Sequence, residues 1–268
     1  MSKRALTFLF PWLFGLVLFL LGPILASLLL SFTHYDGISL PVFTGLNNYQ
    51  HMFSDPVLVA SLQVTLSFAL VSLPLGTIVA IAFAVLLNQK ISGLSFYRAC
   101  LYLPSVIPIV ASSVVWIWIF KNGGWLSNPK LALPALIIMS FWSLGNPMII
   151  YLAGLQNIPD SLYESAEIDG ASEWQKFWHI TIPILSPTIF FNVVIGIIQV
   201  FQYFVPAYVM TSGGPQNATM FYSLYTYQTA FDDFEMGYAS ALAWLLFAIV
   251  LIATSAAFYG SKKLVHYS

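Results

Sequence analysis

Charge is what this sequence has least of: 7% of its 268 residues are Asp, Glu, Lys or Arg, whereas 59% are hydrophobic. A soluble domain carries about 25% charged residues, so this chain cannot cover itself with a polar surface. The formal net charge of −1 leaves no basic patch that could hold the phosphates of a nucleic acid. The composition therefore indicates an integral membrane protein and excludes a nucleic-acid partner.

Cysteine and clustered histidine are also scarce. The single cysteine, Cys100, excludes an internal disulfide and a Cys-based metal cluster, and its apolar neighbours predict a packed thiol. The histidines stand singly, without metal-ligand spacing or a nucleophile–base pattern; they are His34, His51, His179 and His266. No Gly-x-x-x-x-Gly-Lys-Ser/Thr phosphate loop occurs. The sequence therefore predicts no catalytic residue, no metal site and no cofactor bound by this chain.

Runs without charge are long enough to cross a membrane six times. A helix crosses the bilayer in about 20 residues, and we expect one transmembrane domain, residues 1–268, with spans at about 8–32, 59–88, 99–120, 132–156, 184–210 and 237–261. The run after Ile180 could hold two spans, but Thr211–Asn217 is rich in turn residues. Ala218–Phe231 is too short and too polar to cross, so we expect an interfacial helix there.

The basic residues orient these spans. Lys3 and Arg4 precede a charge-free run, Ala5–Thr33, that is longer than the ~7–15 residues of a signal-peptide core, so we expect an uncleaved first span. Lysine and arginine favour the inner side of a membrane, and an N-in, C-in arrangement places seven of them there: Lys3, Arg4, Lys90, Arg98, Lys176, Lys262 and Lys263. Lys121 and Lys130 then lie outside.

Two classes of membrane protein can be tested against this pattern of spans and charges. A secondary transporter or channel that works alone needs ionisable groups within its spans or an inverted repeat, and every acidic residue here lies in a predicted loop. An intramembrane enzyme needs an acid–base or metal constellation, which the sequence lacks. Co-purification with an ATPase distinguishes these classes from an ATP-driven transporter.

The segment from Tyr163 to Pro187 holds four of the ten carboxylates. Ser161 and Glu164 have the spacing of a capping box, Gly170 is a natural helix stop, and Ser172 with Gln175 repeats the capping spacing. We expect two short capped helices that meet at a tight turn at Asp169–Gly170. Taken alone, such a segment could also be an ordinary solvated loop.

The same segment resembles a family motif. Glu164-Ser165-Ala166, Gly170, Ile180 and Ile182-Pro183 resemble the loop by which permease subunits of binding-protein-dependent ABC importers dock onto their ATPase. The resemblance implies a type I ABC importer permease fold with cytoplasmic coupling helices in a coupling loop at residues 157–183. It implies ATPase-coupling roles for Tyr163, Glu164, Ser165, Ala166, Asp169, Gly170 and Ala171.

Four further segments are similar to the carbohydrate branch of this family, which includes the large permease subunit of the maltose transporter and sugar and glycerol-phosphate permeases. They are Pro104–Pro108, Gly154–Pro159, Met210–Pro215 and Gly237–Trp244. The resemblance implies a sugar or glycerol-phosphate-like substrate, a second homologous permease subunit, an ABC ATPase dimer that binds ATP and Mg, and an external solute-binding protein. It implies a multi-pass protein in the plasma (inner) membrane of a bacterium or archaeon, surrounded by lipid.

Polar side chains within two predicted spans are candidates for the substrate pathway. Amides are costly in lipid unless they face a cavity or a partner helix. In the fifth span Asn192, Gly196, Gln199 and Tyr203 share one helix face, and Gln202 lies beside it. The candidate set consists of Asn192, Gln199, Gln202 and Tyr203, with Trp142, Ser143 and Asn146 in the fourth span. The alternatives are interhelical hydrogen bonds for the amides and a membrane-interface position for Trp142. Prolines and glycines in the spans serve either helix packing or hinges.

The external solute-binding protein is expected over two outer segments. Thr211–Phe234 carries no Lys or Arg, contains a Gly213-Gly-Pro215 turn and is rich in aromatic residues. An aromatic helix can anchor at the headgroup level and still present Asn217 and Gln228 to a docking protein. We predict that the solute-binding protein covers this segment and Asp36–Pro56.

Overall fold

The computed structural model describes residues 3–89 and 92–264, so Lys90 and His266 lie outside the described residues. The described chain is helical except for turns and one antiparallel pair of two-residue strands, β1 (Thr33–His34) and β2 (Val42–Phe43). Its contacts divide into two units. Unit 1 comprises Met1–Val59 with Tyr225–Ile249, and unit 2 comprises Ala60–Leu224 with Val250–Ser268.

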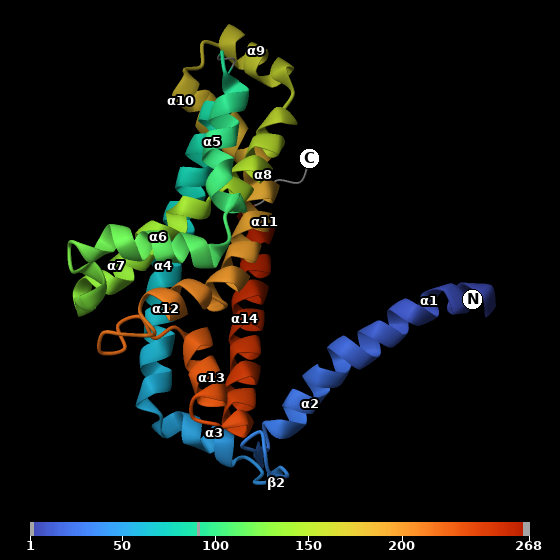
Figure 1. The fold of residues 1–268 in the computed structure, drawn as a ribbon. Coiled ribbons are helices and arrows are strands. Elements are labelled where there is room, and N and C mark those ends of the chain that lie inside the picture. The colour runs from blue at the N-terminus through green and yellow to red at the C-terminus, as the bar shows by residue number, and fades with distance from the viewer. Residues whose placement is uncertain (1–2, 90–91, 265–268) are drawn as a thin grey trace. The chain divides into compact units, whose positions relative to one another are not determined.

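Unit 1 begins with a long apolar helix and continues into short elements (Figure 1). The stretch Phe8–Leu30 has a hydropathy of 2.6 and is not buried within the chain, as expected for a helix that meets lipid. Unit 1 contains α1 (Lys3–Gly15), the π-helical η1 (Leu16–Leu21), α2 (Gly22–Leu30), β1, β2, α3 (Asn47–His51), η2 (Met52–Ser54), the start of α4 (Pro56–Leu87), most of α13 (Tyr222–Phe231) and the first half of α14 (Met236–Leu264).

A buried aspartate holds the short elements of unit 1 together. Asp55 is 5% exposed. Its Oδ2 accepts hydrogen bonds from the hydroxyls of Tyr225 on α13 and Tyr238 on α14, the latter at 2.6 Å. Its Oδ1 accepts from the backbone N–H groups of Val57 and Leu58 at 2.9 and 3.1 Å, and so caps the start of α4. We call Asp55, Tyr225 and Tyr238 the Asp55 cluster.

Burial and hydrogen bonding act in opposite directions on this carboxyl group. Burial acts to raise the pKa of Asp55, but hydrogen bonds from Tyr225, Tyr238 and the two backbone amides outweigh it. The pKa therefore lies below its usual value, because every one of these bonds is donated to the ionised form. Asp55 is a charged anchor at neutral pH.

Unit 2 contains the remaining elements, and its core is formed by α4, α8 and α11. The cluster buries small residues such as Ala80 and Ala84 against Tyr151 and Leu185, so these helices approach closely. Unit 2 comprises the rest of α4, α5 (Leu94–Val106), α6 (Ile109–Lys121), η3 (Trp125–Ser127), α7 (Pro129–Ser140), η4 (Phe141–Ser143), α8 (Gly145–Gln156), α9 (Asp160–Ile168), α10 (Glu173–Lys176), η5 (Phe177–Thr181), α11 (Ile182–Phe201), α12 (Val205–Met210) and the end of α14.

Several helices are long and apolar enough to cross a membrane. Four qualify as single helices: Phe8–Leu30, Pro56–Leu87, Glu173–Met210 and Met236–Ser261. Two further pairs qualify together but are bent, α5 with α6 by 96° and the α7–η4 stretch with α8 by 47°. The chain is therefore a helical multi-pass membrane protein, and its described residues contain four such helices, or six if each bent pair is one span.

Two local predictions have a clear outcome. The short helix expected in Ala218–Phe231 is present as α13 but begins at Tyr222. The prediction of a packed thiol at Cys100 is wrong for the isolated chain, because Cys100 is exposed. Its position on α5 leaves it on a face that the described residues do not cover.

Candidate functional site

A cavity of about 640 Å³ lies in unit 2 where three helical stretches are interrupted. The interruptions fall at Ile107–Pro108 between α5 and α6, at η4 and Leu144 between α7 and α8, and at Gln202–Phe204 between α11 and α12. Residues from all three interruptions line the cavity. A helix end leaves backbone N–H and C=O groups without helical partners, and a membrane protein tolerates such groups only inside the protein or beside a water-filled cavity.

All seven residues predicted for the substrate pathway line this one cavity. They are Trp142 and Ser143 on η4, Asn146 on α8, Asn192 and Gln199 on α11, and Gln202 and Tyr203 just after α11. The structure thus brings together two groups that the sequence suggested separately. The structure gives the positions of these residues on the cavity wall. Their contact with a substrate stays a prediction.

The predicted helix face is correct for part of this set and wrong at its end. Asn192, Gly196 and Gln199 lie on α11 and face the cavity. However, α11 ends at Phe201, so helical periodicity does not place Tyr203. A turn places it instead, in which the N–H of Tyr203 donates to the carbonyl of Val200 at 3.2 Å.

Asn192 bears on the interhelical alternative. Its Nδ2 donates to the carbonyl of Thr188 at 3.0 Å, one turn earlier on the same helix. This bond satisfies part of the amide within α11 rather than across to another helix. Asn192 lines the cavity, and this hydrogen bond does not join α11 to another helix.

Buried hydroxyl groups without a hydrogen-bond partner in the described chain lie on the cavity wall. They include those of Ser72, Ser105 and Tyr203. The ring of Tyr203 packs against Phe68 and Phe221, with centroid distances of 4.5 and 4.9 Å, so its position is fixed. A buried polar group without a partner costs about 1–3 kcal/mol and calls for an explanation such as a ligand or ordered water.

The serines are the part of the site that the sequence analysis missed. Ser72 and Ser105 stand alone in apolar runs, and serine in a helix often bonds to its own backbone. Their role as cavity hydroxyls depends on contacts between α4, α5 and α11 that local sequence does not reveal. The position of Ser105 between Pro104 and Pro108 was the one available signal.

The cavity wall is uncharged, since none of its residues is Asp, Glu, Lys, Arg or His. Its polar groups are hydroxyls and amides, and Trp142, 44% exposed, offers an aromatic face. Hydroxyls and amides can both donate and accept hydrogen bonds. This chemistry suits a neutral polyhydroxyl solute and offers no general acid, base or nucleophile.

Close approach explains two glycines: Gly196 on the wall, and Gly145 between the wall residues Leu144 and Asn146. A Cβ at Gly145 would lie 2.5 Å from Ser105 Oγ and 3.0 Å from the Cα of Tyr102, and one at Gly196 would collide with Leu73. These glycines therefore serve helix packing, one of the two alternatives for small residues in the spans. Pro108, in contrast, lies at the break before α6.

A second candidate site is the loop that contains α9 and α10. Gly170 ends α9 with a left-handed φ of 77°. The N–H of Gly170 donates to Glu167 and the N–H of Ala171 to Ala166, at 3.0 and 2.9 Å, the two bonds of a Schellman motif. The predicted tight turn between two short helices is confirmed.

The two predicted capping boxes have different outcomes. The box at Ser172 and Gln175 is present and begins α10. The box at Ser161 and Glu164 is wrong, because α9 begins at Asp160 and its cap position is Pro159. Proline before the first turn fixes an extended backbone there, so Ser161 already lies inside the helix and its carbonyl accepts from Ser165 Oγ.

The predicted coupling residues divide into exposed and inward-facing groups. The exposed ones are Glu164, Ser165, Asp169 and Gly170. Ala166 and Ala171 are half-buried, and Tyr163 packs against the core cluster with its hydroxyl 2.9 Å from Thr181 Oγ1. Tyr163 therefore ties α9 to η5 and is only partly exposed.

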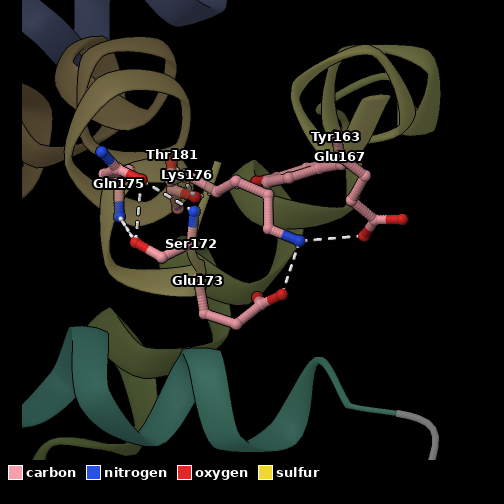
Figure 2. A network of polar contacts seen from close by, with 7 residues as sticks. All are labelled: Tyr163, Glu167, Ser172, Glu173, Gln175, Lys176 and Thr181. Carbon is pink, nitrogen blue, oxygen red and sulfur yellow. Dashed lines mark hydrogen bonds and ion pairs between the residues drawn. The ribbon is translucent and has the colours of Figure 1, made fainter. Parts of the chain in front are cut away.

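Lys176 adds an ionic contact that the sequence analysis did not identify. Its Nζ lies 2.9 Å from Glu167 Oε1 on α9 and 2.5 Å from Glu173 Oε1 on α10. Figure 2 shows the lysine side chain reaching from α10 toward both carboxylates. We call Lys176, Glu167 and Glu173 the Lys176 cluster.

No group of three or more His, Cys, Asp or Glu within residues 3–89 and 92–264 could hold a metal ion. The Asp55 and Lys176 clusters are held by hydrogen bonds and ion pairs from protein groups alone. No metal ion is needed to explain how either cluster is held.

Comparison with known proteins gives consistent matches. A family profile described as "Binding-protein-dependent transport system inner membrane component" matches residues 72–265. The probable ABC transporter permease protein YesP of Bacillus subtilis (strain 168) is 43% identical, over 97% of this chain and 91% of that protein. The lactose transport system permease protein LacF of Rhizobium radiobacter is 33% identical, over 96% of this chain and 93% of that protein.

A solved structure matches the fold. It is a bacterial alginate ABC transporter in complex with an alginate pentasaccharide-bound periplasmic protein, with a TM-score of 0.82 and 23% sequence identity over 98% of this chain and 95% of that one. At this identity the match concerns the fold alone.

Proposed function

Because the chain belongs to the family of inner membrane components of binding-protein-dependent transport systems, we propose that it forms half of a sugar-conducting pathway in an ATP-driven importer. The family identifies it as a permease subunit of an ABC transporter and not as an enzyme. A second, homologous permease subunit forms the other half of the pathway. The importer lies in the inner membrane of a bacterium or archaeon.

The cavity is the observation that carries the substrate proposal. Its uncharged wall of hydroxyls, amides and Trp142 offers a sugar both hydrogen bonds and a ring face. The relative LacF is named for lactose transport, which agrees with a neutral saccharide. A glycerol-phosphate-like substrate also has hydroxyls, but its negative charge would have to be met by the second permease subunit.

The proposed topology of this chain has six spans with both termini inside. It counts each of the two bent pairs as one span beside the four long helices. The N-in, C-in orientation leaves seven Lys and Arg residues inside and two outside. In this arrangement the loop that contains α9 and α10 faces the cytoplasm, as a coupling loop must.

The exposed face of α9 is the proposed docking surface for the ABC ATPase dimer. Glu164, Ser165 and Asp169 project from this helix, and the Schellman turn at Gly170 fixes where it ends. Gly170→Pro removes the N–H that bonds Glu167 and forbids the left-handed backbone; Glu164→Lys reverses one surface charge. Both variants should insert in the membrane and lose uptake, and normal ATP-driven uptake in both would refute the docking assignment.

The outer segments remain the predicted contact for the solute-binding protein. Asn217 is exposed in the loop after α12, so a cysteine there is accessible to a crosslinker. Crosslinks from this position to the solute-binding protein in an ATP-trapped complex support the topology. Crosslinks to the ATPase instead would invert it.

Uptake measured in the assembled importer tests the cavity. Gln199→Ala and Tyr203→Ala each remove groups from the wall, and a hydrogen bond to substrate contributes about 0.5–1.5 kcal/mol, so uptake should fall by a few-fold to about tenfold. The ATPase should still co-purify. Tyr259→Ala, at a 76% exposed position on α14, is the control and should transport normally. Loss of assembly in the cavity variants would mean that these residues hold helices together.

A further inference from the structure

Lys176 lies at the junction between the two helices of the loop. Its side chain is 6% exposed, although the side chains of Glu167 and Glu173 are 64% and 90% exposed. The lysine stem is therefore packed inside the loop while its charged end meets carboxylates at the surface (Figure 2). This arrangement differs from an ordinary surface ion pair, in which both side chains are free to move in water.

Local structure directs Lys176 toward α9. The Schellman turn at Gly170 reverses the chain, and the capping box of Ser172 and Gln175 sets the first turn of α10. Lys176 ends this four-residue helix, so it faces back across the turn to Glu167. The hydrogen bond between Tyr163 and Thr181 is a second tie between the same two segments.

Apolar packing alone does not fix the orientation of α9. On α9, Ile168 and Leu162 are 87% and 41% exposed, and Tyr163 packs against the core cluster. A helix of nine residues is also not stable by itself in water. Polar ties to the next segment must therefore contribute to how α9 is held.

The segment that carries Lys176 continues into the cavity. α10, η5 and α11 form one helical run from Glu173 to Phe201, and this run contributes Asn192 and Gln199 to the cavity wall. The Lys176 cluster thus connects the exposed helix α9 with the helical run that reaches the cavity.

We propose that Lys176 is a positioning residue that holds α9 rigidly to the α10–α11 run, so that movement of a docked ATPase reaches the cavity wall. This inference rests on the proposed docking of the ATPase at α9. Lys176 itself touches neither ATPase nor substrate in this role. Its loss should separate ATP hydrolysis from transport while leaving the complex assembled.

The test uses the complete importer in lipid vesicles and measures solute molecules transported per ATP hydrolysed. Lys176→Met keeps most of the packed stem and removes the charge, and the ratio should fall about fivefold or more, within the usual range of coupling between sites. Lys176→Arg keeps the charge and should restore the ratio to within about twofold. Lys121→Met, at an exposed lysine on α6, is the matched control and should leave the ratio unchanged.

A purely structural role predicts a different pattern. It would lower the yield and the melting temperature of the complex in Lys176→Met but leave the ratio of transport to hydrolysis as it is in the original chain. That result, or a normal ratio in a complex of normal yield, would overturn the proposal. Glu167→Gln, which keeps the ion pair with Glu173, should give an intermediate ratio; a ratio lower than that of Lys176→Met would also contradict it.

The docking proposal is tested separately on the chain that retains Lys176. A cysteine at Ser165, in a Cys100→Ser background, should crosslink to the ATPase. If it does not, the docking assignment fails. If it does, and Lys176→Met retains full coupling, docking stands and the role of Lys176 fails.

Discussion

Asp55 in unit 1 and Lys176 in unit 2 are buried charges, each 5% exposed, but their partners differ in kind. Asp55 receives bonds from neutral groups, including two tyrosines that lie 170 and 183 residues further along the chain. Lys176 meets two charged and exposed carboxylates that lie nine and three residues before it. The first joins distant segments, whereas the second joins neighbouring helices.

This difference has a physical consequence for movement. The donors to Asp55 lie within the chain, and separating them would leave a buried carboxylate without compensation, which is costly. The carboxylates of the Lys176 cluster are already largely in water, so separating this contact leaves only the packed ammonium without partners. The Asp55 cluster is therefore expected to be the stronger joint, and the Lys176 cluster holds α9 at a smaller cost in desolvation.

Asp55→Ala should have the largest effect on the free energy of unfolding. Hydrogen bonds to a charged group contribute about 1.5–3 kcal/mol each, so loss of the bonds from Tyr225 and Tyr238 should lower the free energy of unfolding by at least about 3 kcal/mol. Unfolding of the purified chain in mixed micelles measures it. Asp36→Ala, at an aspartate that is only half-buried, is the control. Equal destabilisation by the two variants would show that burial is not the cause.

Removing the two ends of the Lys176 cluster should have unequal effects. Lys176→Met leaves two solvated carboxylates and should cost less than about 1 kcal/mol, as for exposed pairs. The double variant Glu167→Ala, Glu173→Ala leaves a packed ammonium without a partner and should cost about 1–3 kcal/mol. The same unfolding assay compares them. Equal costs would mean that the ammonium escapes to water.

Low pH should remove the contribution of Asp55 to stability, which is a smaller effect. The pKa of Asp55 is lower in the folded chain than its ordinary value of 3.8, so its contribution to stability is present above that value and is lost as the pH falls through the folded-state pKa. Unfolding between pH 7 and 5 should not report Asp55, whereas below about pH 4 the loss can reach about 1.4 kcal/mol per pH unit.

Asp36 is the control for this titration. Its Oδ1 accepts bonds from the backbone of Ile38 and Ser39 and from the Ser39 hydroxyl, which lower its pKa to about 2, so it titrates in the same acid range. Asp55→Asn and Asp36→Asn should each flatten the pH dependence below pH 4, because the pKa of both carboxyl groups is lowered in the folded chain. A steeper dependence in Asp55→Asn would contradict the assigned pKa direction.

The sequence was sufficient where a single property runs along a segment. The apolar runs predicted the long helices, including Pro56–Leu87 and Met236–Ser261, and the Gly170 turn followed from glycine geometry. The family assignment from Glu164-Ser165-Ala166 and Gly170 is confirmed by the profile match. These features depend on neighbours in the chain, which a sequence displays directly.

Features that depend on distant contacts were not predictable in the same way. The 96° bend between α5 and α6 is consistent with Pro108, but its angle is set by tertiary packing. The Asp55 cluster needs partners more than a hundred residues away. The seven cavity residues were found from their polarity, but Ser72 and Ser105 joined them only through the folded arrangement.

The hydroxyls of Ser72, Ser105 and Tyr203 also bear on how long a solute stays. Buried polar groups that lack protein partners are satisfied by water in a cavity of this size. A solute that took the place of that water would exchange one set of hydrogen bonds for another of similar strength, so we expect its residence time in the cavity to be short. A translocation pathway works fastest when each site admits its cargo but does not retain it, and such a wall favours turnover over capture.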